Sequence, residues 1–175
     1  GIYDGDLEAS IRQMYETNPL PAACGRICTH KCETVCALAK QGEPVAIRWL
    51  KRYALDAADP EMVRRVALEG KLVAPTGAKV AIIGAGPAGL SAAYYLSGLG
   101  VACTIFERMP KGGGTMRYGI PAYRLPDEAL DREIGHIEAM GVEIRTGVTV
   151  GRHIPWSTLR NQFDAVIIAV GFPVG

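Results

Sequence analysis

The amino-acid sequence predicts two regions of different class. Residues 1–72 are expected to form a small α-helical domain. Residues 73–175 are expected to form an α/β Rossmann-like half-domain with a parallel sheet. Apolar residues recur at helical spacing in the first region, whereas the second alternates between β-branched runs and helix patterns. Between them, the segment GKLVAPTGA (residues 70–78) has the Gly and Pro content of a linker.

The first region contains three expected helices. Asp6 is placed to cap a helix that ends near Thr17, where an Asn-Pro pair follows. Pro44 is expected to be the first helical residue of a second helix, since proline suits that position. A third helix starts at Asp59 and stops at Gly70.

The second region begins with a β-α-β pattern, which predicts parallel strands joined by a crossover helix. A Gly- and Pro-rich loop follows, and then a helix that Asp127 is expected to cap, with two short strands and a final apolar strand after it. The expected segments are strands at 79–84, 101–107, 142–145, 147–150 and 165–170, helices at 87–99 and 127–140, and the loop at 111–126.

Composition and charge exclude several classes of protein. Apolar residues make up 49% of the 175 residues and charged residues 21%, which is globular usage rather than that of a disordered chain. The formal net charge of +1 gives no electrostatic reason to expect nucleic-acid binding. Residues 80–106 carry no charge, but glycines and a proline interrupt them, so we expect buried strands and no membrane insertion.

A glycine turn joins the first expected strand to the helix after it. Gly84-Ala85-Gly86-Pro87-Ala88-Gly89 is a G-x-G-x-x-G sequence in the strand–turn–helix context of a dinucleotide-binding site. Gly84 permits the tight turn, Gly86 lets the backbone approach a pyrophosphate, and Gly89 allows close packing of helix on strand. Glu107, which ends the second strand, can accept hydrogen bonds from a ribose and repel a 2′-phosphate, although Arg108 beside it offsets that charge.

FAD and NAD share this fingerprint, and two later segments favour FAD. Residues 163–171 (FDAVIIAVG) form an apolar strand with an Ala-x-Gly end, which in flavoproteins of this fold passes near the pyrophosphate. The loop at residues 112–126 is longer than an ordinary connection, and a mobile surface loop is the alternative interpretation.

Four of the five cysteines lie within thirteen residues, at Cys24, Cys28, Cys32 and Cys36. Such clustering indicates metal or iron–sulfur ligation in a reducing compartment, and we therefore expect a cytoplasmic protein. On one continuous helix the four positions would span about 18 Å and could not converge. Either the backbone breaks, with Gly25 and Thr29 as candidate points, or two centres share the four thiols.

The spacing favours iron–sulfur over zinc, because zinc sites usually contain C-x2-C pairs, which are absent here. A site without metal is the remaining alternative. His30 is interpreted as a surface residue rather than a ligand, and Cys103 as a small buried apolar residue.

The order of these motifs resembles a known family. CGRICTHKCETVC, GEPVAIRWLKRYALD, APTGAKVAIIGAGPAGLSAA and GGTMRYGIPAYRLP are similar to segments of the glutamate synthase small (beta) subunit and of the N-terminal part of dihydropyrimidine dehydrogenase. They also resemble the flavin subunits of electron-bifurcating, formate- and hydrogenase-linked oxidoreductases. The resemblance runs from Asn18 to Gly171 and does not single out one member.

The resemblance implies an electron-transfer module in which hydride passes from NAD(P)H to FAD, and electrons then pass through 4Fe–4S clusters to a partner subunit such as the glutamate synthase large subunit. It implies cluster ligation by the four clustered cysteines and leaves the catalytic residues unknown. The FAD-binding positions that it implies are Gly84, Gly86, Pro87, Ala88, Gly89, Glu107, Gly114, Arg117, Gly119, Arg124, Ala169 and Gly171.

Two departures from the family lead us to expect an excised part of a larger flavoprotein. Relatives carry further cysteines upstream, and they continue into a second dinucleotide-binding domain, where NAD(P)H would bind as substrate. We therefore expect the chain alone to be inactive with NAD(P)H and its FAD affinity to be reduced. The alternatives are a non-catalytic nucleotide-binding module with a zinc-stabilised docking element, and an NAD-dependent dehydrogenase that uses the glycine turn for nicotinamide.

Overall fold

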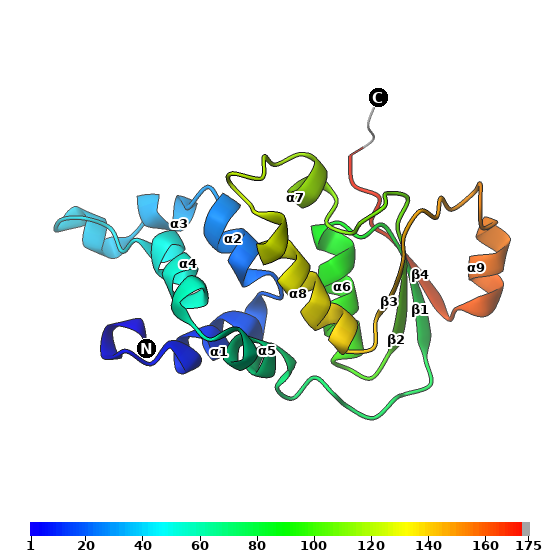
Figure 1. The fold of residues 1–175 in the computed structure, drawn as a ribbon, viewed down its shortest axis with the longest axis horizontal. Helices are drawn as coiled ribbons and strands as arrows, with labels where there is room; N and C mark the ends of the chain where they lie inside the picture. Colours follow the sequence, from blue (N-terminus) through cyan, green and yellow to red (C-terminus); the bar gives the residue numbers. More distant parts are fainter. Residues whose placement is uncertain (173–175) are drawn as a thin grey trace. The chain divides into compact units, whose positions relative to one another are not determined.

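The computed structural model describes residues 1–172 and divides into two compact units. The first unit comprises Gly1–Ala67 and the second begins at Leu68 (Figure 1). A helical domain therefore precedes a Rossmann-like parallel sheet, and the predicted fold class is confirmed. Among residues 1–172, no helix is both long and apolar enough to cross a membrane.

The helical unit consists of short helices around a small apolar core. Its core side chains come from α1, α2, α4 and α5 and include Ile11, Tyr15, Ala23, Ala54 and Val63. Its elements are η1 (Ile2–Asp4), α1 (Leu7–Thr17), α2 (Pro21–Ile27), α3 (Lys31–Thr34), η2 (Ala37–Lys40), α4 (Ile47–Ala57) and α5 (Pro60–Leu68), whose last residue begins the second unit.

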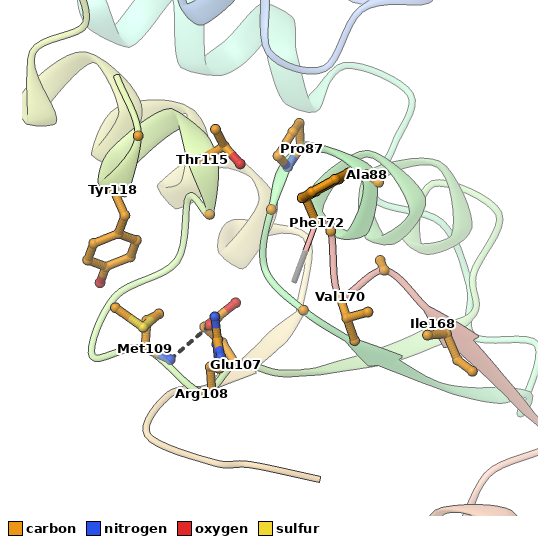
Figure 2. Close-up of a pocket in the computed structure, with 16 residues that line it drawn as sticks. Pro87, Ala88, Glu107, Arg108, Met109, Thr115, Tyr118, Ile168, Val170 and Phe172 are labelled. Atoms are coloured by element: carbon orange, nitrogen blue, oxygen red, sulfur yellow. Dashed lines mark hydrogen bonds between the residues drawn. The ribbon is translucent and has the colours of Figure 1, made fainter. Parts of the chain in front are cut away.

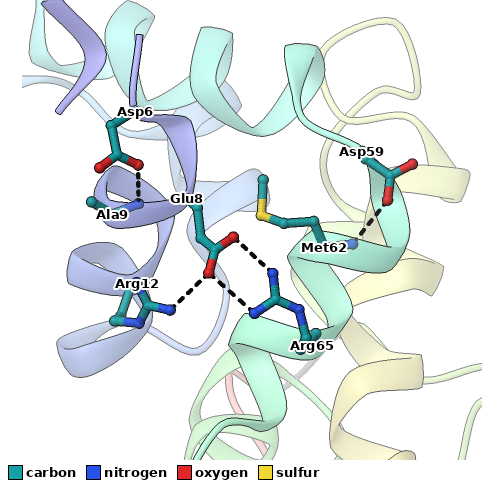
Figure 3. Close-up of polar contacts among 7 residues, drawn as sticks. All are labelled: Asp6, Glu8, Ala9, Arg12, Asp59, Met62 and Arg65. Carbon is teal, nitrogen blue, oxygen red and sulfur yellow. Dashed lines mark hydrogen bonds and ion pairs between the residues drawn. The ribbon is translucent and has the colours of Figure 1, made fainter. Parts of the chain in front are cut away.

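Two of the three predicted helix starts are confirmed. Asp6 accepts a hydrogen bond from the Ala9 N–H at 2.9 Å, and Asp59 accepts one from the Met62 N–H at 2.9 Å (Figure 3). The prediction that Pro44 begins a helix is wrong, because α4 begins at Ile47. The N–H of Arg48 in its first turn donates to the Glu33 carboxylate at 3.1 Å, so a residue from α3 sets the start of α4.

An ion-pair cluster links α1 to α5. The Glu8 carboxylate accepts hydrogen bonds from Arg65 Nη2 at 2.7 Å and from Arg12 Nη2 at 2.8 Å (Figure 3). These bonds, that from Arg65 first, lower the pKa of Glu8 from 4.5 to about 2. Because the folded-state pKa is lowered, the contribution of Glu8 to stability is present above pH 4.5 and is lost as the pH falls towards 2.

We expect Glu8→Gln to lower the stability of the helical unit at neutral pH by a small, salt-sensitive amount, because the cluster is exposed. The difference from wild type should vanish by about pH 2, where the native carboxylate is also half protonated. Urea unfolding followed by Trp49 fluorescence, in a Trp156→Phe background, measures it. Glu61→Gln, an exposed acid on α5, is the control, and a difference that persists at pH 2 would contradict this assignment.

The second unit is built on a four-stranded parallel sheet with the order β3-β2-β1-β4. The parallel pairing of β1 with β2 confirms the predicted β-α-β pattern. The strands are β1 (Lys79–Ile83), β2 (Ala102–Phe106), β3 (Glu143–Arg145) and β4 (Ala165–Ile168), and the helices are α6 (Pro87–Ser97), α7 (Thr115–Tyr118), α8 (Asp127–Ala139) and α9 (Trp156–Gln162).

Both faces of the sheet are covered. Helices α6 and α8 lie on one face and α9 on the other (Figure 1). On the α9 face, Leu159 packs with Ala81 of β1 and Phe106 of β2, and all three are buried. The central strands β1 and β2 are thereby fixed, and the loops after them are held in defined positions.

Several predicted boundaries of this unit are corrected. Residues 147–150 do not form a strand, because the N–H groups of Gly147 and Val148 bond to the carbonyls of Met109 and Glu107 after β2. Only an isolated bridge joins Val150 to Ile154. Asp127 is the first residue of α8 rather than its cap. The helices α7 and α9 are additional to the prediction, α7 lying inside the predicted loop.

Candidate functional site

A cavity of about 620 Å³ lies where the parallel strands end, which is where ligands bind in open α/β sheets. Four segments form its wall: the glycine turn with the start of α6, the residues after β2, the α7 loop, and the residues after β4 (Figure 2). The lining residues are Gly84, Gly86, Pro87, Ala88, Glu107, Arg108, Met109, Gly114, Thr115, Tyr118, Gly119, Ile168, Ala169, Val170, Gly171 and Phe172.

Gly84 has a backbone conformation and surroundings that exclude a side chain. Its φ is +107°, and a Cβ there would lie 2.4 Å from the carbonyl oxygen of Ala169. The chain after β4 therefore passes directly against the turn, and the Ala169 N–H bonds to the Ile83 carbonyl at 2.8 Å. This contact brings the Ala-x-Gly segment into the cavity wall.

The glycine turn is also in backbone contact with the α7 loop. A Cβ on Gly114 would lie 2.7 Å from Gly86 Cα, and Gly114 has a φ of +52°. The Gly113 N–H donates to the Ala85 carbonyl at 2.7 Å. The two glycine segments thus form one wall of bare backbone beside the first turn of α6, where free N–H groups and the helix dipole favour an anion.

Gly89 lies outside the cavity wall and acts through packing. A Cβ on this residue would lie only 2.0 Å from the Gly84 carbonyl oxygen and 3.2 Å from Ile82 Cγ2. The absence of a side chain therefore lets α6 approach the end of β1 closely, which is the packing effect expected of the third glycine.

The Glu107 carboxylate fastens the turn to the end of β2. It is buried, and one of its oxygens accepts the Ala85 N–H at 2.7 Å. The other oxygen accepts the Met109 N–H at 2.8 Å (Figure 2). Glu107 also lines the cavity, so the residue that holds the turn in place can also contact a ligand.

Of the twelve predicted FAD-binding positions, nine lie in the wall of the cavity, and Gly89, Arg117 and Arg124 do not. Arg117 is held by Gly112 and α8, and Arg124 is exposed after α7. Sequence reasoning missed seven wall residues, namely Arg108, Met109, Thr115, Tyr118, Ile168, Val170 and Phe172. In the sequence, these residues are marked only by lying one or two positions from a predicted FAD-binding residue.

A second cavity of about 440 Å³ adjoins the first on the side of β2. The two share Glu107 and Arg108, with the turn and the residues after β4. Apolar side chains of Ile83, Phe106, Val148, Val150 and Val170 dominate its lining.

The cysteine segment is broken into short pieces rather than one helix. Helix α2 ends at Ile27, and α3 begins at Lys31 after His30, whose φ of +44° is the single positive value among described non-glycine residues. Of the two candidate break points, Thr29 lies between the two helices as expected, whereas Gly25 is wrong. Helix α2 runs through Gly25, where a Cβ would lie 3.2 Å from the backbone of Arg52 on α4.

The four thiols lie on α2 (Cys24), at its end (Cys28), on α3 (Cys32) and at the start of η2 (Cys36). Backbone hydrogen bonds, those of Val45 and Leu38 first, lower the pKa of the Cys36 thiol, as thiolate ligation requires. Within the described part of the chain, no three His, Cys, Asp or Glu side chains gather into a set that could hold a metal ion. The donor chemistry thus suits an iron–sulfur centre, but the thiols do not form one ligand shell.

Two family models match the chain. Residues 1–63 match the model described as dihydropyrimidine dehydrogenase domain II, 4Fe-4S cluster, and residues 82–138 match a NAD(P)-binding Rossmann-like domain. The chain is 39% identical, over 96% of its length, to the glutamate synthase [NADPH] small chain of Escherichia coli. It belongs to the family of the glutamate synthase small chain and the N-terminal part of dihydropyrimidine dehydrogenase.

Two other members of this family are similarly close. The chain is 41% identical, over 97% of its length, to the NADP(+)-dependent formate dehydrogenase subunit beta of Moorella thermoacetica. It is 38% identical, over 99% of its length, to the NAD-dependent dihydropyrimidine dehydrogenase subunit PreT homolog of Salmonella typhi. The chain spans 27%, 42% and 35% of the formate dehydrogenase, PreT and glutamate synthase relatives, respectively.

Proposed function

We propose that the cavity at the ends of the strands binds FAD and that the chain is the flavin-binding and iron–sulfur part of an NAD(P)H oxidoreductase subunit. The observation that carries this proposal is the wall of bare backbone formed by Gly84, Gly86 and Gly114 beside the first turn of α6. It leaves room for a diphosphate at a helix N-terminus, where the N–H groups and dipole stabilise negative charge.

The cavity continues past Glu107 into the apolar second cavity, which suits the adenine ring that FAD and NAD share. The opposite end of the cavity supports FAD over NAD. In the other direction the α7 loop and the residues after β4 extend the wall, with Tyr118 and Val170 among them, which suits a large planar ring such as a flavin. We propose that Ala169 and Gly171 hold the flavin side and that Glu107 faces the ribose.

Bound FAD would supply an acceptor for hydride and a donor of single electrons. The chain's own residues would position the FAD. The glycine turn would hold the diphosphate, and the surrounding backbone would keep water away from the diphosphate. We propose Cys24, Cys28, Cys32 and Cys36 as iron–sulfur ligands, with their final arrangement formed when the centre assembles.

We infer that NAD(P)H binds outside this chain and that electrons leave to a partner subunit. The names of the relatives support this class of activity, since they describe subunits of NADPH- and NAD-dependent oxidoreductases. Glutamate synthase and formate dehydrogenase chemistry are both compatible with such an input module.

The FAD proposal predicts that Ala88→Glu weakens flavin binding without harming the fold. Ala88 is exposed at the start of α6, where an acid favours the helix but repels a diphosphate. We expect FAD affinity, measured by quenching of flavin fluorescence, to fall at least about tenfold. Ala102→Glu, exposed at the opposite end of β2, is the control. Wild-type binding of NAD in preference to FAD would refute the proposal.

The same wild-type chain, reconstituted without oxygen in the presence of iron and sulfide, tests the cysteine segment. Bound iron and sulfide with a broad visible shoulder would support iron–sulfur ligation. Zinc bound in their place would instead support the docking-module alternative.

A further inference from the structure

The α7 loop forms one wall of the proposed FAD site, and one buried arginine fastens that loop to α8. The Arg117 side chain is only 5% exposed. Its Nε donates to the Gly112 carbonyl at 2.6 Å, its Nη1 lies 3.1 Å from Asp127 Oδ1, and its Nη2 is hydrogen-bonded to Asp131. The guanidinium therefore joins the start of the loop to the first two turns of a neighbouring helix.

The arrangement leaves little of Arg117 for a ligand. Its side chain does not line either cavity, whereas the loop residues Gly114, Thr115 and Tyr118 do. Nε and Nη2 are hydrogen-bonded within the unit, and Nη1, which makes no hydrogen bond, lies in an ion pair with Asp127. The two carboxylates together carry more charge than the arginine. A second cation also approaches the acid pair, with Lys111 Nζ lying 4.0 Å from Asp131.

The loop has a second attachment, to the glycine turn. Gly113 and Gly114 meet the glycine turn through the hydrogen bond to Ala85 and the close approach to Gly86. On the other side, a Cβ on Gly113 would lie 2.8 Å from Leu130 of α8 and 3.0 Å from Arg117 Cβ. If the arginine were lost, Asp127 and Asp131, which lie one helical turn apart, would keep only the more distant Lys111 as a counter-charge.

We propose that Arg117 is a positioning residue, which holds the α7 loop in its ligand-binding place through Asp127 and Asp131 and does not touch the cofactor. This inference rests on the proposed FAD function and departs from the direct role that family resemblance gives Arg117. Its consequence is that the apparent affinity for FAD depends on acids outside the cavity, since affinity falls with the fraction of chains whose loop is in place.

The decisive comparison is between the arginine and its two acids. We expect Arg117→Met and the double variant Asp127→Ala/Asp131→Ala each to weaken FAD binding about tenfold, measured by fluorescence quenching on the 175-residue chain. If Arg117 instead bound the diphosphate directly, removal of the acids would leave the affinity unchanged or raise it. That outcome would overturn the proposal. Arg132→Met, exposed on α8, is the matched control and should bind FAD as wild type does.

A second measurement needs no flavin and keeps the two proposals separate. Without FAD, we expect faster hydrogen exchange in both variants at the amides of Met116, Arg117, Tyr118 and Gly119, which bond within the loop. Arg117→Lys, which keeps the charge but not the fork geometry, should lie between wild type and Arg117→Met. If wild type bound no FAD but both variants freed the loop, the flavin assignment would fail and the positioning role would stand. Unchanged exchange in both variants would refute that role.

Discussion

Gly89→Ala is expected to destabilise the α/β unit by about 3 kcal/mol, at the upper end of what overpacked sites cost. The added Cβ would lie 2.0 Å from the Gly84 carbonyl oxygen, and no flexible side chain can move aside there. Either α6 shifts away from β1 or the glycine turn distorts, so FAD binding should be lost together with stability. Urea unfolding followed by Trp156 fluorescence, in a Trp49→Phe background, reports on this unit alone.

Gly135→Ala provides a matched control within the same unit. Gly135 also lies inside a helix, α8, but a Cβ there would meet no atom within 4 Å. Alanine is the better helix former, so this change should stabilise the unit by about 0.5–1 kcal/mol. If both substitutions proved equally mild, the close packing of α6 on the turn would not be the reason for a glycine at position 89.

Glu107→Gln is the second change with a large expected effect, about 2 kcal/mol of lost stability. Each oxygen of the buried carboxylate accepts one backbone N–H, from Ala85 and from Met109. An amide offers a single oxygen, so its NH₂ group must face one of these two donors. The turn would loosen at Ala85, which also bonds to the α7 loop, and FAD affinity should fall with it.

The same urea unfolding of the Trp49→Phe background measures this loss, together with a titration of FAD by fluorescence quenching. Glu138→Gln, an exposed acid near the end of α8, should change neither quantity. A Glu107→Gln variant with native stability but weakened FAD binding would show that the carboxylate acts on the ligand and not on the turn.

Local sequence signals predicted much of the fold. The caps at Asp6 and Asp59 and the parallel β-α-β pattern each depend on residues near one another in the chain, and the structure has them in place. Pro44 failed as a helix start because Glu33, fifteen residues before Arg48, supplies an acceptor for the first turn of α4. Residues 147–150 failed as a strand because the N–H groups of Gly147 and Val148 bond to carbonyls that follow the end of β2.

In the candidate site, too, the sequence pattern predicted some features and missed others. The sequence pattern indicated the residues that must lack a side chain, and Gly84 and Gly114 owe this to close backbone approaches. It did not indicate what each arginine contacts. Arg117 was expected at the cofactor, whereas its guanidinium contacts Gly112, Asp127 and Asp131.

The sequence by itself determined the β-α-β unit, the glycine turn and the clustering of thiols, because these follow from backbone freedom, hydrophobic periodicity and residue chemistry at short range. Only the tertiary structure decided which backbones meet at Gly84 and Gly114 and that Glu107 is bonded to the turn. It alone decided that Arg117 faces α8. Such contacts join segments up to 85 residues apart, as between Gly84 and Ala169, and steric exclusion between packed backbones has no signature in either segment alone.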